Sequence, residues 1–174
     1  KLNILSFKTK NINTNTMDSL NISYKLTQKK KFIGIINLPL NKYKIKKTID
    51  KSFIDQTSFF SKKEKEKYSN MVFYHKKKIF IPLTIHIEIK KVYKSFQNKI
   101  LMSKKINNLY HTLINDFKIT KPKMILAGIN PHAGENNTIS RDDNKYLQPI
   151  INKLKKKGIF IHGPVSVDGI INTE

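Results

Sequence analysis

The sequence contains no cysteine among its 174 residues. Disulfide bonds and thiolate metal sites are therefore excluded, and the absence fits a reducing compartment. No apolar stretch approaches the ~18–20 residues that a membrane span requires, and no signal-peptide pattern opens the chain. We therefore expect a cytoplasmic protein that makes no use of a membrane. The first residue is Lys1 rather than methionine, which indicates a piece of something longer.

Arginine is almost missing as well. Arg141 is the only one, although lysine and arginine together number 34 and the formal net charge is +22. Base recognition and bidentate phosphate binding favour arginine, because its planar guanidinium donates paired hydrogen bonds. The lysines are spread along the chain, and aromatic residues do not alternate with them as a single-strand binding platform requires. A solvated lysine-rich surface is therefore favoured, and a nucleic-acid-binding protein is the least favoured alternative.

The length is that of one domain, since domains run to roughly 100–200 residues. Short apolar runs bounded by Gly, Pro or Asn predict strands in this chain. We expect them at residues 32–36, 71–74, 79–81, 123–127 and 159–161. A His-Lys-Lys-Lys turn would join the second and third of these strands, and the third is expected to continue past Pro82 toward His86.

Helices are predicted between these strands. Apolar residues recur at helical spacing over residues 104–117 and 142–157, with Gly158 placed to cap the second helix. A further helix is expected at 17–26, whereas 42–61 is expected to be irregular, with a loop at 53–60 packed by aromatic residues. The alternation of strands and helices predicts an α/β fold with a parallel or mixed sheet.

One block combines a histidine with turn residues. Gly-Ile-Asn-Pro-His-Ala-Gly-Glu, residues 128–135, follows an apolar run and contains His132. His86 is expected to leave another strand in the same way. Imidazole is a common metal ligand, and a catalytic site needs about three protein ligands and an open position. The alternative is that each imidazole only hydrogen-bonds to a nearby backbone carbonyl, which is the interpretation given to His75, His111 and His162.

The motif Asn-Pro-His-Ala-Gly-Glu resembles a signature of the 4-hydroxythreonine-4-phosphate dehydrogenase family of pyridoxal phosphate biosynthesis. Four further segments resemble that family in the same order and spacing. They are Pro39–Lys42, Gln56–Phe60, Thr84–Ile87 and Gly163–Asp168. The resemblance extends from about residue 31 to the end of the sequence and is weak before that.

The resemblance implies a fold similar to that of isocitrate and isopropylmalate dehydrogenases, with a cleft active site and a homodimer. It implies that His86 and His132 bind a divalent cation (Zn, Mg or Co). Thr57 would contact a phosphorylated amino-acid substrate, Gln56 takes the position of a substrate-binding histidine, and Lys42 matches a lysine of the same cleft. The implied reaction is the NAD-dependent oxidation of 4-phosphooxy-L-threonine, with decarboxylation to 3-amino-2-oxopropyl phosphate.

Several positions depart from the family pattern. Gln56 cannot titrate, Ser58 replaces a carboxylate, and Asn136, Asn137 and Ser140 replace glycines. In the family, a third metal histidine and most of the dinucleotide-binding segment follow the matched region, and a Gly-rich strand precedes it. Residues 1–174 therefore resemble the central part of the enzyme and are not expected to be active alone. A degenerate, non-catalytic relative is the main alternative to a functional dehydrogenase.

Overall fold

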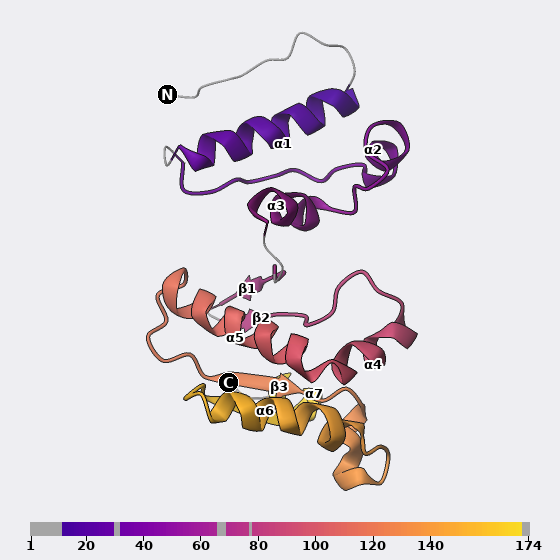
Figure 1. Cartoon of the computed structure of the whole chain (residues 1–174), viewed down its shortest axis with the longest axis vertical. Helices are drawn as coiled ribbons and strands as arrows, with labels where there is room; N and C mark the ends of the chain where they lie inside the picture. Colours follow the sequence, from indigo (N-terminus) through magenta and orange to yellow (C-terminus); the bar gives the residue numbers. More distant parts are fainter. Residues whose placement is uncertain (1–11, 30–31, 66–68, 77, 172–174) are drawn as a thin grey trace. The chain divides into compact units, whose positions relative to one another are not determined.

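A computed structural model describes residues 12–29, 32–65, 69–76 and 78–171 of the chain. The chain divides into two units, Lys1–Ser69 and Asn70–Glu174, and each is described by itself (Figure 1). Within the described ranges, no helix has both the length and the apolar character needed to cross a membrane.

The first unit is helical. It contains α1 (Ile12–Gln28), α2 (Lys42–Thr48) and α3 (Gln56–Glu64) (Figure 1). Their buried core is formed by Leu20, Ile45 and Phe53, against which Met17, Leu40, Phe59 and Phe60 pack. The helix expected at 17–26 is confirmed, and it is longer than its pattern indicated.

Two helices replace the irregular segment expected at 42–61. They begin where a short polar side chain accepts a hydrogen bond from the first turn, which satisfies an amide that the helix itself cannot. Asn41 accepts from the amide of Lys44 at 3.0 Å, and Asp55 accepts from the amide of Ser58 at 2.7 Å. The expected aromatic packing is present, with ring centroids 5.2 Å apart for one edge-to-face pair, Phe59 and Phe60.

The prediction of a strand at residues 32–36 is wrong. These residues carry no strand hydrogen bonds, and the side chains of Ile33 and Ile36 are fully exposed. A strand needs a neighbour to pair with, and no described part of the chain pairs with this segment. An apolar run alone therefore did not determine the local structure.

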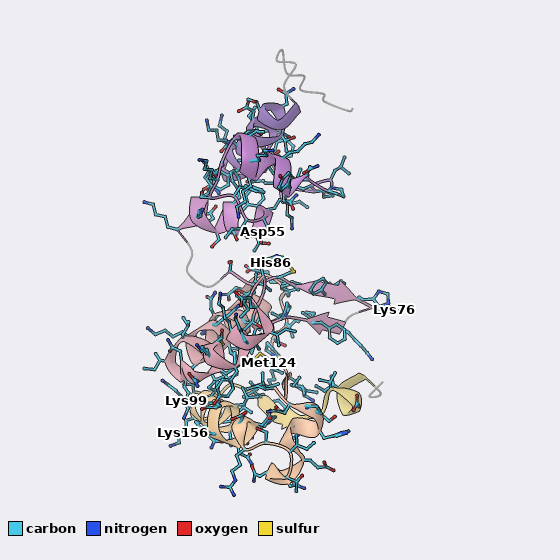
Figure 2. All side chains as sticks on the ribbon, turned by 90° about the vertical axis from the view of Figure 1, so that its right-hand side faces the viewer. Asp55, Lys76, His86, Lys99, Met124 and Lys156 are labelled. Atoms are coloured by element: carbon cyan, nitrogen blue, oxygen red, sulfur yellow. The ribbon has the colours of Figure 1, made fainter. Side chains whose placement is uncertain are left out.

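The second unit begins with a hairpin. Its strands β1 (Phe73–His75) and β2 (Lys78–Phe80) are antiparallel, and Phe73 lies opposite Phe80. Figure 2 shows Lys76 at the tip of this hairpin. The predicted pair of strands is confirmed with slightly shifted ends. The expected continuation of the second strand toward His86 is wrong, because β2 ends at Phe80, just before Pro82, whose missing N–H would interrupt the strand pairing.

The remainder of the second unit has α/β architecture (Figure 1). Strands β3 (Met124–Ala127) and β4 (Ile161–Val165) pair in parallel, as the alternating pattern predicted. Between and before them lie α4 (Ile89–Gln97), α5 (Lys99–Asn115) and α6 (Gln148–Lys155). The helices predicted at 104–117 and 142–157 are confirmed, whereas α4 was not predicted. Strand β4 begins later than expected and runs through Gly163 and Pro164.

The core of the second unit lies where α5 and α6 pack with β3 and β4. Leu147, Ile151 and Leu154 are completely buried there. Burying each such aliphatic side chain contributes about 1.5–3 kcal/mol. The three side chains fix α6, and with it the loop that connects β3 to this helix, against the strand pair.

An apolar groove of about 720 Å³ lies in the second unit between residues 78–84 and 122–129. Ile79 and Ile81 line one wall and Met124 and Leu126 the other. Within the described residues, β4 is the only strand that pairs with β3. Residues of β3 and of the helices α4 and α5 also line the groove.

Candidate functional site

The carboxyl ends of β3 and β4 bring two short elements together. A turn, η1 (Pro131–Asn137), follows β3, and a short helix, α7 (Val167–Ile171), follows β4. The Nδ1 atom of His132 lies 3.8 Å from Oδ2 of Asp168, and both side chains are largely exposed. Ligand sites in α/β folds occupy such strand ends. The structure thus places His132 after a strand, as the sequence indicated. The carboxylate beside it was not expected.

The His132 turn has an unusual backbone. Residues 132–136 all have positive φ angles, between 43° and 78°, so the chain winds in the left-handed sense. The left-handed conformation costs an L-residue roughly 1–2 kcal/mol, and only glycine adopts it freely. Gly134 is the single glycine in this run. The turn therefore needs anchors elsewhere in the structure.

The buried carboxylate of Asp143 provides such an anchor. Its side chain is only 1% exposed. Oδ1 accepts a 2.7 Å hydrogen bond from the amide of Ile129, and Oδ2 accepts a 2.9 Å bond from Nδ2 of Asn130. Hydrogen bonds to an ionised acceptor are about twice as strong as neutral ones. Asp143 therefore ties the start of the turn to the helix that follows it.

Two glycines allow this close packing. A Cβ atom on Gly134 would lie 2.3 Å from the carbonyl oxygen of Ser140, and one on Gly128 would lie 2.7 Å from Cα of Ala133. Real Cβ atoms do not approach backbone so closely. The two glycines of the sequence block are therefore required by the fold of the turn.

Asparagine occupies two positions where the resembled family has glycine. Asn136 and Asn137 have φ angles of 52° and 74°, and Asn144 donates a 2.8 Å hydrogen bond to Oδ1 of Asn137. Asparagine adopts this region more readily than most other residues with a side chain. These two substitutions are therefore compatible with a left-handed turn.

His86 lies in a different setting from the one expected. It is exposed in the loop between β2 and α4, six residues beyond the end of the strand, and has a positive φ of 54° (Figure 2). The strand stops before reaching it, so His86 is not a residue at a strand end. Lys105 of α5 also binds this loop, because it donates a 2.7 Å hydrogen bond to the carbonyl of Leu83.

The donor atoms for a metal ion are incomplete. In the part of the chain that the structure describes, no cluster of three or more His, Asp or Glu side chains could hold a metal. His132 and Asp168 provide donors of the right kind but not the right number for a catalytic site. A shared site of His86 and His132 remains a prediction.

The candidate substrate-binding residues all belong to the first unit. Lys42 is exposed at the start of α2, and Gln56 and Thr57 are half-buried in the first turn of α3. Nε2 of Gln56 donates a 3.4 Å hydrogen bond to the carbonyl of Leu38. This bond joins the beginning of α3 to the segment that precedes Lys42. The assignment of the three side chains to substrate binding remains a prediction.

Sequence reasoning gave no role to Asp143 or Asp168. Asp143 could have been noticed, because acidic residues gather in the first turn of helices and it is the second residue of the helix predicted at 142–157, whereas no helix was predicted near Asp168. Their partners could not have been deduced. The bond between Asp143 and Asn130 joins residues 13 positions apart, and it depends on the left-handed turn between them.

Residues 5–174 match the family model described as pyridoxal phosphate biosynthetic protein PdxA. The chain belongs to this family. Two 4-hydroxythreonine-4-phosphate dehydrogenases are among its relatives in the PdxA family. The protein of Wigglesworthia glossinidia brevipalpis is 34% identical over 141 residues, which cover 81% of this chain and 42% of the relative. That of Aquifex aeolicus is 32% identical over 135 residues, covering 78% and 41%.

The fold agrees with this membership. The solved 4-hydroxythreonine-4-phosphate dehydrogenase of Klebsiella pneumoniae superposes with a TM-score of 0.79 at 20% identity, covering 91% of this chain and 48% of that one. The predicted α/β fold of a PdxA-like protein is thereby confirmed. The chain spans less than half the length of these three PdxA relatives.

Proposed function

We propose that this PdxA-family chain is the metal- and substrate-binding part of an NAD-dependent 4-hydroxythreonine-4-phosphate dehydrogenase. The reaction oxidises 4-phosphooxy-L-threonine and releases carbon dioxide, leaving 3-amino-2-oxopropyl phosphate. The observation that carries the proposal is the signature turn at the end of β3, which presents His132 beside Asp168. The family match over residues 5–174 supports the same reaction.

His132 is proposed as a metal ligand. The carboxylate of Asp168 lies 3.8 Å from Nδ1, which is too far for a hydrogen bond but close enough for its negative charge to favour a proton on that atom. Nε2 then keeps its lone pair for a cation, which is the usual arrangement of a metal-binding histidine. A divalent cation such as Zn²⁺, Mg²⁺ or Co²⁺ held there would lower the pKa of the substrate hydroxyl and so favour hydride transfer to NAD.

The phosphate of the substrate is assigned to Lys42, Gln56 and Thr57. An ammonium, an amide and a hydroxyl group can each donate to phosphate oxygens. Gln56 and Thr57 lie in the first turn of α3, whose N-terminus is already capped by the carboxylate of Asp55, so the side chains rather than the helix dipole would bind the phosphate. Gln56 can orient the phosphate, but it cannot transfer a proton as the family's histidine could.

We further propose that the metal site is completed in a homodimer. At this turn the described residues supply one proposed ligand, His132, with Asp168 beside its other ring nitrogen, which is fewer donors than a catalytic metal needs. Ligands from a second subunit would complete the set, as the family resemblance implies.

The second candidate function is that of a non-catalytic relative. Gln56 favours it, because a side chain that cannot titrate replaces a family histidine. The left-handed φ angles of Asn136 and Asn137 oppose it, since they retain the backbone that glycine would allow. We therefore favour the functional dehydrogenase.

Calorimetric titration of the full-length gene product with Co²⁺ alone tests the proposal. The parent protein is compared with His86→Ala and His132→Ala, and with His75→Ala as a control for an exposed histidine of the β1–β2 hairpin. Both site substitutions should abolish binding, and the control should leave it unchanged. Absence of binding in the parent, or equal binding by all variants, would favour the non-catalytic relative.

A further inference from the structure

We propose that Asp143 is a positioning residue. Its hydrogen bonds to Ile129 and Asn130 stabilise the left-handed turn and thereby determine the position of His132. The inference rests on the function proposed above, because it concerns the same site. Asp143 belongs to none of the motifs that identify the family resemblance. Its side chain is 1% exposed and both its carboxylate oxygens bind the segment that leads into the turn.

The two hydrogen bonds act on consecutive residues. Oδ1 of Asp143 accepts from the backbone of Ile129, and Oδ2 accepts from the side chain of Asn130. Asn130 in turn accepts, through its carbonyl, a 3.0 Å bond from the amide of Ala133. His132 lies inside this last loop. A shift of the carboxylate would therefore move the residues on both sides of the imidazole.

The far side of the turn also rests on Asp143. A Cβ atom built on Gly134 would lie 3.4 Å from Oδ2 of Asp143, so the backbone there is packed against the carboxylate. The left-handed run costs about 1–2 kcal/mol for each residue with a side chain. Charge-assisted bonds to a buried carboxylate can offset part of that cost. Without them the turn should relax toward other conformations.

Asp143 belongs to a helix that is itself packed in the core. Asp143 is the first residue of η2 (Asp143–Leu147), which continues directly into α6. Leu147 and Ile151 anchor this continuous helix in the core with no exposed surface. The core therefore fixes the helix, the helix fixes Asp143, and Asp143 fixes the turn that carries His132.

Asp143→Leu tests the inference, because it keeps the branching and the number of heavy atoms of the side chain and removes both acceptors. Without metal, hydrogen exchange of the Ile129 amide should become at least about tenfold faster. NMR contacts between the His132 ring and α7 should be lost, while the amide of Ile151 in the core stays protected. Affinity for Co²⁺ should fall about tenfold to a hundredfold, the range seen when partners that orient a metal ligand are removed.

Three comparison variants make the result specific. Asp142→Leu changes the neighbouring carboxylate and should match the parent. In Asp143→Asn, the amide oxygen can still accept from Ile129. If the Asn130 amide rotates, its oxygen can accept from the new amide nitrogen, so this variant should restore most of the contacts of the His132 ring. Asn130→Ala removes one of the two hydrogen bonds from the side of the turn and leaves the core unchanged. It should also weaken the contacts of the His132 ring, and it provides the test if Asp143→Leu does not fold.

The inference would be overturned if Asp143→Leu or Asn130→Ala left the His132 ring contacts as in the parent. It would also be overturned if Asp142→Leu lost them equally, since the effect would then be one of charge. Failure of the parent to bind Co²⁺ would count against the proposed function alone, because the ring contacts and amide exchange are measured without metal.

Discussion

The ammonium group of Lys105 donates a 2.7 Å hydrogen bond to the carbonyl oxygen of Leu83. The side chain is about half-buried, and loss of water around the ammonium lowers the pKa of Lys105 below its ordinary value of 10.5. The bond connects α5 to the loop that carries His86, three residues beyond Leu83. A partly desolvated charge therefore holds one of the two histidine segments.

Stability should depend on pH through Lys105. Because its pKa is lower in the folded chain, the unfolded chain binds more protons between that lowered pKa and 10.5, and folding becomes more favourable as pH rises through this interval. Lys105→Met should remove that gain. Urea unfolding of parent and variant at increasing pH measures it, with exposed Lys104→Met as the control. A parent and a Lys105→Met variant with the same pH dependence would contradict the prediction.

The hydroxyl groups of Tyr93 and Tyr146 lie 2.9 Å apart and should titrate as a pair. Their shared hydrogen bond, followed by smaller effects that include Lys145, lowers the pKa of Tyr146, whereas the same bond raises the pKa of Tyr93. Tyr93→Phe should therefore raise the pKa of Tyr146 toward its ordinary value. The absorbance of tyrosinate as a function of pH measures this. Tyr43→Phe, which changes an exposed tyrosine of α2, should leave the first ionisation step where it is.

Two glycines with the same φ should respond differently to alanine. Gly134 and Gly158 both have a φ of 78°, but an added Cβ meets the carbonyl of Ser140 at 2.3 Å in the first case and open space in the second. Gly158→Ala should cost about 1–2 kcal/mol for the left-handed backbone alone. Gly134→Ala should cost a further ~1–3 kcal/mol from overpacking. Urea unfolding compares them, and equal losses would show that the turn yields to the added methyl group.

Sequence patterns identified the parts of the fold that are stabilised by their own periodicity. The apolar stripe of residues 104–117 and the run at 123–127 indicated α5 and β3, and Gly158 ends its helix in the left-handed conformation expected of a cap. The position of His132 after β3 followed from the same reasoning. In each case the residues that decide the structure are neighbours in sequence, so their pattern was sufficient.

Features that depend on distant partners were missed. The run at 32–36 has the composition of a strand but no strand partner in the described chain, and α3 begins at a cap provided by Asp55, in a segment whose aromatic residues suggested a loop. His86 was placed at the end of a strand that stops at Phe80. The role of Asp143 requires a hydrogen bond across the turn, which no local pattern reveals.

The groove beside β3 gives the chain two opposing tendencies in solution. Ile125 on β3 keeps 52% of its surface exposed, and apolar residues line about 720 Å³ next to it, so contact between molecules would remove apolar surface from water. A net charge of +22 repels them over a range that shrinks to about 10 Å at 0.1 M salt. The chain should therefore stay monomeric at low ionic strength and self-associate as salt is added.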